Sequence, residues 1–205
     1  MRTNSRPRVK IPTPERLSNV ALHYLGRFAA SEQSLRKVLQ NRIRKAAMAD
    51  PGFAADSERQ TQLRAAIETI IEKHRRTGAL NDKAYAEMKV RGLRRAGKSA
   101  RAISQKLAAK GVGREVAAAS LGGGEESEGD PEADELKAAR IFARRKKLGP
   151  FRAASATTSA VSAASDMQRK AAAQKDMAAM ARNGFSYDVI RKILGGDATD
   201  EEDFG

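Results

Sequence analysis

Cations without a recognisable catalytic group crowd residues 81–112, whose sequence is NDKAYAEMKVRGLRRAGKSARAISQKLAAKGV. Residues 81–121 contain ten Lys or Arg and only three Asp or Glu. Lys and Arg side chains bind carboxylates and phosphates through charge-assisted hydrogen bonds. The chemistry that this segment supports is therefore the binding of an anionic partner.

The spacing of these residues places most of the cations on one side of a predicted helix that begins at Asp82. At about 100° per residue, the apolar side holds Tyr85, Ala86, Met88, Val90, Leu93 and Ala96. The other side holds Lys83, Arg91, Arg94, Arg95 and Lys98, and the charge continues into the next helix at Arg101, Lys106 and Lys110. We expect the apolar side to build the fold and the cationic side to face an anionic partner. The alternative is an ordinary solvated helix face.

A second basic run, ARRKKLGPFR, occupies residues 143–152. It binds phosphate in one interpretation, and in the other its cations complement the dipole at the carboxyl end of a helix. The N-terminal residues 1–12 are also basic, and they form either an electrostatic tether or an unremarkable tail. The candidate contact residues are Arg91, Arg94, Arg95, Lys98, Arg101, Lys110, Arg144, Arg145, Lys146 and Lys147.

Signals of an enzyme are missing from the sequence. His23 and His74 stand alone without metal-ligand spacing, the chain has no Cys, and the GGGEE segment lacks the Lys-Ser/Thr of a phosphate-binding loop. We therefore expect no catalytic residue, no metal and no cofactor. The aromatic residues are expected to be core anchors rather than base-stacking platforms, with Phe142 and Phe151 left open; the expected anchors are Tyr24, Phe28, Tyr85, Phe185 and Tyr187.

Composition narrows the class of protein further. The chain has 205 residues and a formal net charge of +14, with only 4% aromatic residues and no Trp. So basic a chain meets polyanions in a cell, which makes nucleic acid or a nucleic-acid complex the expected partner. The N-terminus lacks the apolar region of a secretory signal, and no window approaches the roughly 18 apolar residues of a membrane span. We expect a cytoplasmic monomer that does not contact membranes.

Helix signals recur along the chain and position these residues. Thr13 caps a helix that continues through Phe28, Ser31 caps a second, and Ser57 with Gln60 forms a capping box before a third. Gly78 ends the third helix. The pattern then restarts with a helix after Asn81-Asp82, another capped by Ser99, and a short third before Gly122.

The order of these helices is an internal repeat. SEQSLRKVL at Ser31 matches SARAISQKL at Ser99, and residues 107–121 align without gaps on residues 180–194. Gly111 falls on Gly184 in this alignment, where a helix end favours a left-handed residue. The predicted fold is all-α, with tandem three-helix units in an elongated curved array.

The predicted organisation has six parts. A basic arm (1–12) precedes the first repeat (13–78) and the second repeat (79–122). An acidic linker (123–130) leads to the third repeat (131–195), which carries a low-complexity Ala/Ser/Thr insertion at 151–166, and an acidic tail (196–205) follows.

Three segments resemble the RecX family of bacterial recombination regulators: YLGRFAASEQSLRKVL, GALNDKAYAEMKVRGLRRAGKSARAISQKLAAKGV and DMAAMARNGFSYDVIRKIL. The resemblance covers roughly Leu17 to Leu194 and departs from the usual pattern near Pro51 and in the insertion. It implies binding to RecA filaments on single-stranded or duplex DNA. It also implies inhibition of the ATPase, strand-exchange and co-protease activities of RecA. The residues alone also allow a stand-alone helix–turn–helix DNA-binding protein, although no helix displays the Arg/Asn/Gln cluster of base readout.

Overall fold

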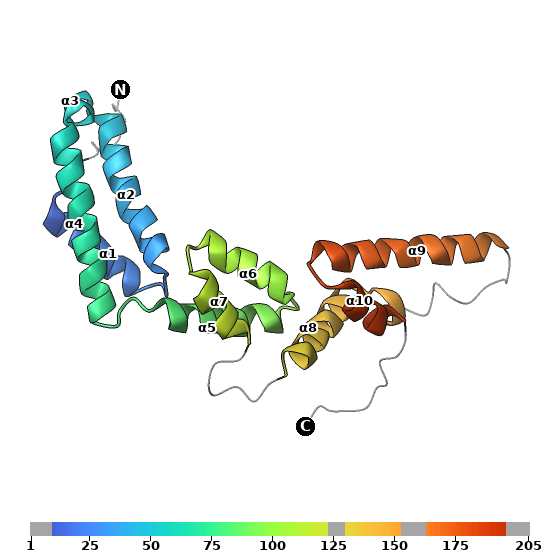
Figure 1. Cartoon of the computed structure of the whole chain (residues 1–205). Coiled ribbons are helices and arrows are strands. Elements are labelled where there is room, and N and C mark those ends of the chain that lie inside the picture. Colours follow the sequence, from blue (N-terminus) through green and yellow to red (C-terminus); the bar gives the residue numbers. More distant parts are fainter. Residues whose placement is uncertain (1–9, 123–129, 153–162, 196–205) are drawn as a thin grey trace. The chain divides into compact units, whose positions relative to one another are not determined.

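The computed structural model describes residues 10–122, 130–152 and 163–195, and among them every regular element is a helix (Figure 1). The α-helices are α1 (Pro14–Leu25), α2 (Glu32–Ala49), α3 (Pro51–Ala55), α4 (Ser57–Arg76), α5 (Asp82–Arg95), α6 (Ala100–Ala109), α7 (Arg114–Leu121), α8 (Pro131–Lys146), α9 (Ala163–Arg182) and α10 (Tyr187–Leu194). A single 3₁₀ turn, η1 (Gly149–Phe151), follows α8. The prediction of an all-α chain is confirmed. The acidic tail and most of the basic arm, of the acidic linker and of the insertion lie outside the described residues.

The described residues fall into two compact units. The first unit ends at Tyr85 and also includes Ala109–Val112, and the second unit comprises Ala86–Ala108 and the residues from Gly113 onward. Helix α5 crosses the border between them. The predicted boundaries of the three repeats therefore describe the sequence pattern, and they do not coincide with the borders of the compact units.

The core of the first unit lies between α1, α2 and α4. The periodic apolar positions of these helices converge there because each helix buries one stripe of its surface. The buried residues of this cluster are Leu17, Ala21, Leu35, Leu39, Ile43, Ala46, Phe53, Leu63, Ile67, Ile70, Ile71 and Leu80.

Two local expectations for the first unit are wrong. Helix α1 ends at Leu25, so Phe28 lies beyond it and is 55% exposed instead of anchoring the core. Asp56, not Ser57, caps α4, because its carboxylate accepts the Arg59 amide at 2.9 Å. Between α2 and α4 lies the short helix α3, whose carbonyls accept hydrogen bonds from the Gln60 amide group.

The core of the second unit lies between α8, α9 and α10, and it relies on small residues. Alanines of α8 allow close packing against larger side chains of the other two helices. The buried residues are Ala138, Ala139, Ala143, Leu148, Met180, Phe185, Val189, Ile190 and Ile193. The expected anchor Tyr187 is 67% exposed, and Met88 on the predicted apolar side of α5 is 38% exposed. Tyr85 and Phe185 are buried as expected.

Each compact unit contains the same set of hydrogen bonds between successive repeats, which we call the joint. In the first unit the Ser31 hydroxyl donates to the Lys110 carbonyl at 2.6 Å, and Asp82 accepts the Glu32 amide at 2.9 Å. Ser31 also caps α2, so this joint lies at the first turn of that helix.

The second copy of the joint lies at the start of α6. The Ser99 hydroxyl donates to the Asn183 carbonyl at 2.5 Å, and Glu135 accepts the Ala100 amide at 2.9 Å. Ser99 also caps α6 through the Ala102 amide, as its place in the sequence predicts. In both copies a serine cap binds the carbonyl that precedes a left-handed glycine, Gly111 or Gly184. The predicted equivalence of the two segments is thus confirmed at the level of single hydrogen bonds.

Candidate functional site

The cationic side of α5 divides into bound and unbound cations. Arg91 and Arg95 are exposed, and no hydrogen bond or ion pair engages their side chains among the described residues. They lie four residues apart and share one side of the helix. Arg94 instead forms an ion pair with Glu135, with side-chain exposures of 13% and 17%. The expectation that this arginine faces an external partner without a neighbouring acid is therefore wrong.

The next two predicted contact residues lie where α5 meets α6. The Lys98 ammonium donates to the Asn183 side-chain oxygen at 3.1 Å, and the Asn183 amide donates to the Gly97 carbonyl at 3.1 Å. Lys98 thus belongs to the joint in the second unit. Arg101 is exposed, and its aliphatic stem lies beside Gly184. No hydrogen bond or ion pair engages its guanidinium among the described residues, so this group can bind an external anion.

The four consecutive cations of the second basic run, residues 144–147, occupy the last turn of α8 and the residue after it. Arg144 lies over the Phe151 ring, 5.4 Å from the centroid, in a cation–π contact. The Arg145 guanidinium donates to the Ala96 carbonyl at 2.9 Å, which brings this run beside the end of α5. Lys146 and Lys147 are exposed and carry no ion pair within the described part of the chain. Arg144, Arg145 and Lys146 lie in the last turn of α8, where cations complement the helix dipole, as one of the two interpretations predicts. Phosphate binding by this run stays a prediction.

Lys110 belongs to the first unit, where its backbone carbonyl is part of the joint at Ser31. Its side chain is exposed. The structure therefore does not place it in one cluster with the cations of the second unit.

The amino ends of α2 and α6 are already occupied by protein groups. Exposed backbone amides at such ends are ready sites for phosphate. Asp82 fills this position on α2, and Glu135 fills it on α6. An external phosphate must therefore bind through side-chain cations here. Among the predicted contact residues of the second unit, those whose side chains make no hydrogen bond or ion pair with a described residue, called the free cations below, are Arg91, Arg95, Arg101, Arg144, Lys146 and Lys147.

Three residues that organise the second unit were missed by sequence reasoning. Glu135 and Asn183 form the joint, and Asp176, which is 5% exposed, accepts the Gly149 amide and the Arg152 guanidinium. Their partners lie 24 to 86 residues away in the chain. The alignment of Asn183 on Lys110 was the one available signal, because both residues precede the left-handed glycine.

Other chemistry finds little support in the described residues. No group of three or more His, Cys, Asp or Glu residues among them is arranged to hold a metal ion. No helix in the described ranges is long and apolar enough to cross a membrane.

Fold and charge together define a class: a basic, helical repeat protein. A family model for the second three-helix domain of RecX matches residues 81–121. The chain is 40% identical to "Regulatory protein RecX" of Myxococcus xanthus over 189 residues, which cover 92% of this chain and 88% of that protein. It is 35% identical over 195 residues to the protein of the same name from Agrobacterium fabrum, covering 94% of this chain and 90% of that protein.

The fold is also similar to the crystal structure of RecX from Lactobacillus salivarius. The TM-score is 0.57 at 20% sequence identity, and the match covers 89% of this chain and 94% of that one. The chain belongs to the RecX family of regulatory proteins. The resemblance noted in the sequence is thereby confirmed.

Proposed function

We propose that this protein binds RecA filaments on DNA and inhibits the ATPase, strand-exchange and co-protease activities of RecA. Membership of the RecX family over most of the chain supports this role, because the family resemblance implies it. The proposed partners are the RecA protein and the single-stranded or duplex DNA within or beside the filament. The protein acts as a cytoplasmic monomer without catalysis, metal or cofactor.

The free cations of the second unit carry the structural side of the proposal. Arg91 and Arg95 lie on one side of α5, while the neighbouring Arg94 forms an ion pair with Glu135 within the second unit. Arg145 brings the basic end of α8 to the same end of α5. Cations that have no internal partner retain their full affinity for an external anion, which the filament offers as DNA phosphate and acidic protein side chains.

ATP hydrolysis by a preformed filament tests the role. RecA is assembled on single-stranded DNA with ATP, and this protein is added afterwards. A filament regulator inhibits hydrolysis at fewer than one copy per RecA monomer, without stripping DNA from the filament. A stand-alone helix–turn–helix DNA-binding protein inhibits only in proportion to free DNA, so inhibition that vanishes on the preformed filament would contradict the proposal.

A further inference from the structure

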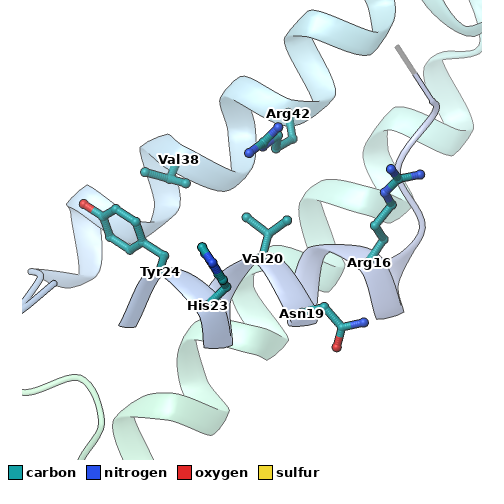
Figure 2. A pocket seen from close by; sticks show the side chains of 7 residues that line it. All are labelled: Arg16, Asn19, Val20, His23, Tyr24, Val38 and Arg42. Atoms are coloured by element: carbon teal, nitrogen blue, oxygen red, sulfur yellow. The ribbon is translucent and has the colours of Figure 1, made fainter. Parts of the chain in front are cut away.

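A groove between α1 and α2 in the first unit is lined by none of the residues assigned to the candidate site (Figure 2). It encloses about 260 Å³. Helix α1 supplies one wall, and α2 supplies the other with Val38 and Arg42. The residues that line it are Arg16, Asn19, Val20, His23, Tyr24, Val38 and Arg42. The groove is therefore lined by two arginines, an amide, an imidazole, one aromatic ring and two valines.

The two arginines of the groove are free to bind an external anion. Both are exposed, and no hydrogen bond or ion pair engages their guanidinium groups within the described ranges. None of the residues that line the groove is acidic. Hydrogen bonds with its own backbone amide and with Thr13 hold the pKa of Glu15 below its ordinary value. Asp50, at the end of α2, accepts the Phe53 amide at 3.0 Å.

Aromatic rings continue the groove at the end of α1. Tyr24 lines it, and the Phe28 ring lies 5.3 Å from the Tyr24 ring, tilted by 44°. Phe28 is 55% exposed, although burying a Phe side chain typically stabilises a protein by about 1.5–3 kcal/mol. Phe28 thus contacts Tyr24, which lines the same groove as the two free arginines. Proteins bind single strands with bases stacked on rings and phosphates on cations.

We propose that the α1–α2 groove binds single-stranded nucleic acid, with Arg16 and Arg42 on successive phosphates and Phe28 stacked against a base. A duplex is a poorer fit, because its bases are stacked inside and do not reach an exposed ring. The inference deepens the proposed function, on which it rests for the source of the strand. Binding to a free oligonucleotide needs no RecA, so the two ideas can fail separately.

The charge test uses a fluorescent oligo-dT and anisotropy at several salt concentrations. Arg16→Gln with Arg42→Gln removes two phosphate contacts and should lower the slope of log affinity against log salt by about 1.4. Affinity near 0.1 M salt should fall by roughly tenfold or more. Arg59→Gln with Arg76→Gln is the matched control, because these exposed arginines of α4 do not line the groove. Equal losses in both double variants, or no loss in the first, would overturn the assignment.

The stacking test changes Phe28 alone. Phe28→Ser should weaken oligo-dT binding about fivefold or more, Phe28→Tyr should retain it, and binding to a duplex should not change in either variant. Parallel losses for duplex and single strand would exclude stacking. A poly-glutamate peptide that displaces oligo-dT from the groove at equal charge concentration would instead assign the groove to an acidic protein. Thermal melts that match the wild type confirm that each variant is folded.

Discussion

Gly111 and Gly184 occupy equivalent places in two repeats, and both have a left-handed backbone, with φ of 77° and 92°. A Cβ at Gly111 would overlap the side chain of Gln33, and one at Gly184 would lie 2.7 Å from the Ser99 hydroxyl oxygen. Gly111→Ala and Gly184→Ala should each lower the free energy of unfolding by about 2 kcal/mol or more, from backbone strain and from the loosened joint. Urea unfolding monitored by circular dichroism measures this loss.

Gly78 supplies the control for these substitutions. Its φ is 72°, but nothing lies within 4 Å of an added Cβ. Gly78→Ala should therefore show backbone strain alone, about 1 kcal/mol, partly offset by the reduced freedom of the unfolded chain. Equal losses at all three glycines would show that the contacts at Gln33 and Ser99 contribute nothing.

His74 makes the stability of the first unit depend on pH. It is 5% exposed, and its Nε2 has no hydrogen-bond partner among the described residues. Burial first, and then the charge of Lys73, lowers the pKa of His74 below its ordinary value. Below about pH 6.5 the unfolded chain binds a proton that the folded chain does not bind, so stability falls as pH falls.

The measurement is urea unfolding between pH 7.5 and pH 5.5. The free energy of unfolding should drop toward pH 5.5, by up to about 1.4 kcal/mol per pH unit from this group. His74→Leu should flatten that drop because it removes the titrating group. The same pH dependence in the variant and the wild type would assign the effect to other residues.

At the level of helices, the joint between α5, α6 and α8 depends on Glu135. Its carboxylate pairs with Arg94 and accepts the Ala100 amide. Glu135→Gln should lower the free energy of unfolding by about 2 kcal/mol, because it leaves a largely buried guanidinium without its counter-charge. Thermal and urea unfolding measure this change.

A surface ion pair from the same helix is the comparison. Glu132 pairs with Lys192 at 2.7 Å, with side-chain exposures of 63% and 52%. Glu132→Gln should change stability by less than about 1 kcal/mol, because exposed pairs are solvated and screened. The role given to the joint is wrong if the two substitutions have the same effect.

Sequence patterns predicted the helices well and their distant partners poorly. Ser31, Ser99, Gly111 and Gly184 followed from local cap and helix-end rules, and the repeat alignment paired them correctly. A helical wheel, however, shows only how residues are arranged around one helix, and it does not show which residues of other helices contact them. It placed Arg94 with the outward cations, although Glu135 reaches it from 41 residues away.

For the whole molecule, which has a net charge of +14, the central feature is the division between cations with partners inside the protein and cations without them among the described residues. Arg94, Lys98 and Arg152 are engaged by Glu135, Asn183 and Asp176 inside the second unit. The free cations remain for an external partner. Replacing Arg94 or Lys98 would therefore mix a loss of stability with a loss of binding, and the informative substitutions are those at Arg91, Arg95 and Arg101.

The central claim is that these three arginines bind the RecA–DNA filament, and the salt dependence of filament affinity tests it most directly. The triple variant Arg91→Gln, Arg95→Gln and Arg101→Gln is compared with the control Arg59→Gln, Arg64→Gln and Arg76→Gln, which removes the same charge from exposed positions of α4. If the arginines bind phosphate, the slope of log affinity against log salt should fall by about 2–3, at roughly 0.7–0.9 per contact. If they bind acidic RecA side chains, affinity should fall with a shallower change in slope and an unchanged affinity for bare DNA. A triple variant that melts normally and binds the filament with the wild-type affinity and slope would contradict the account.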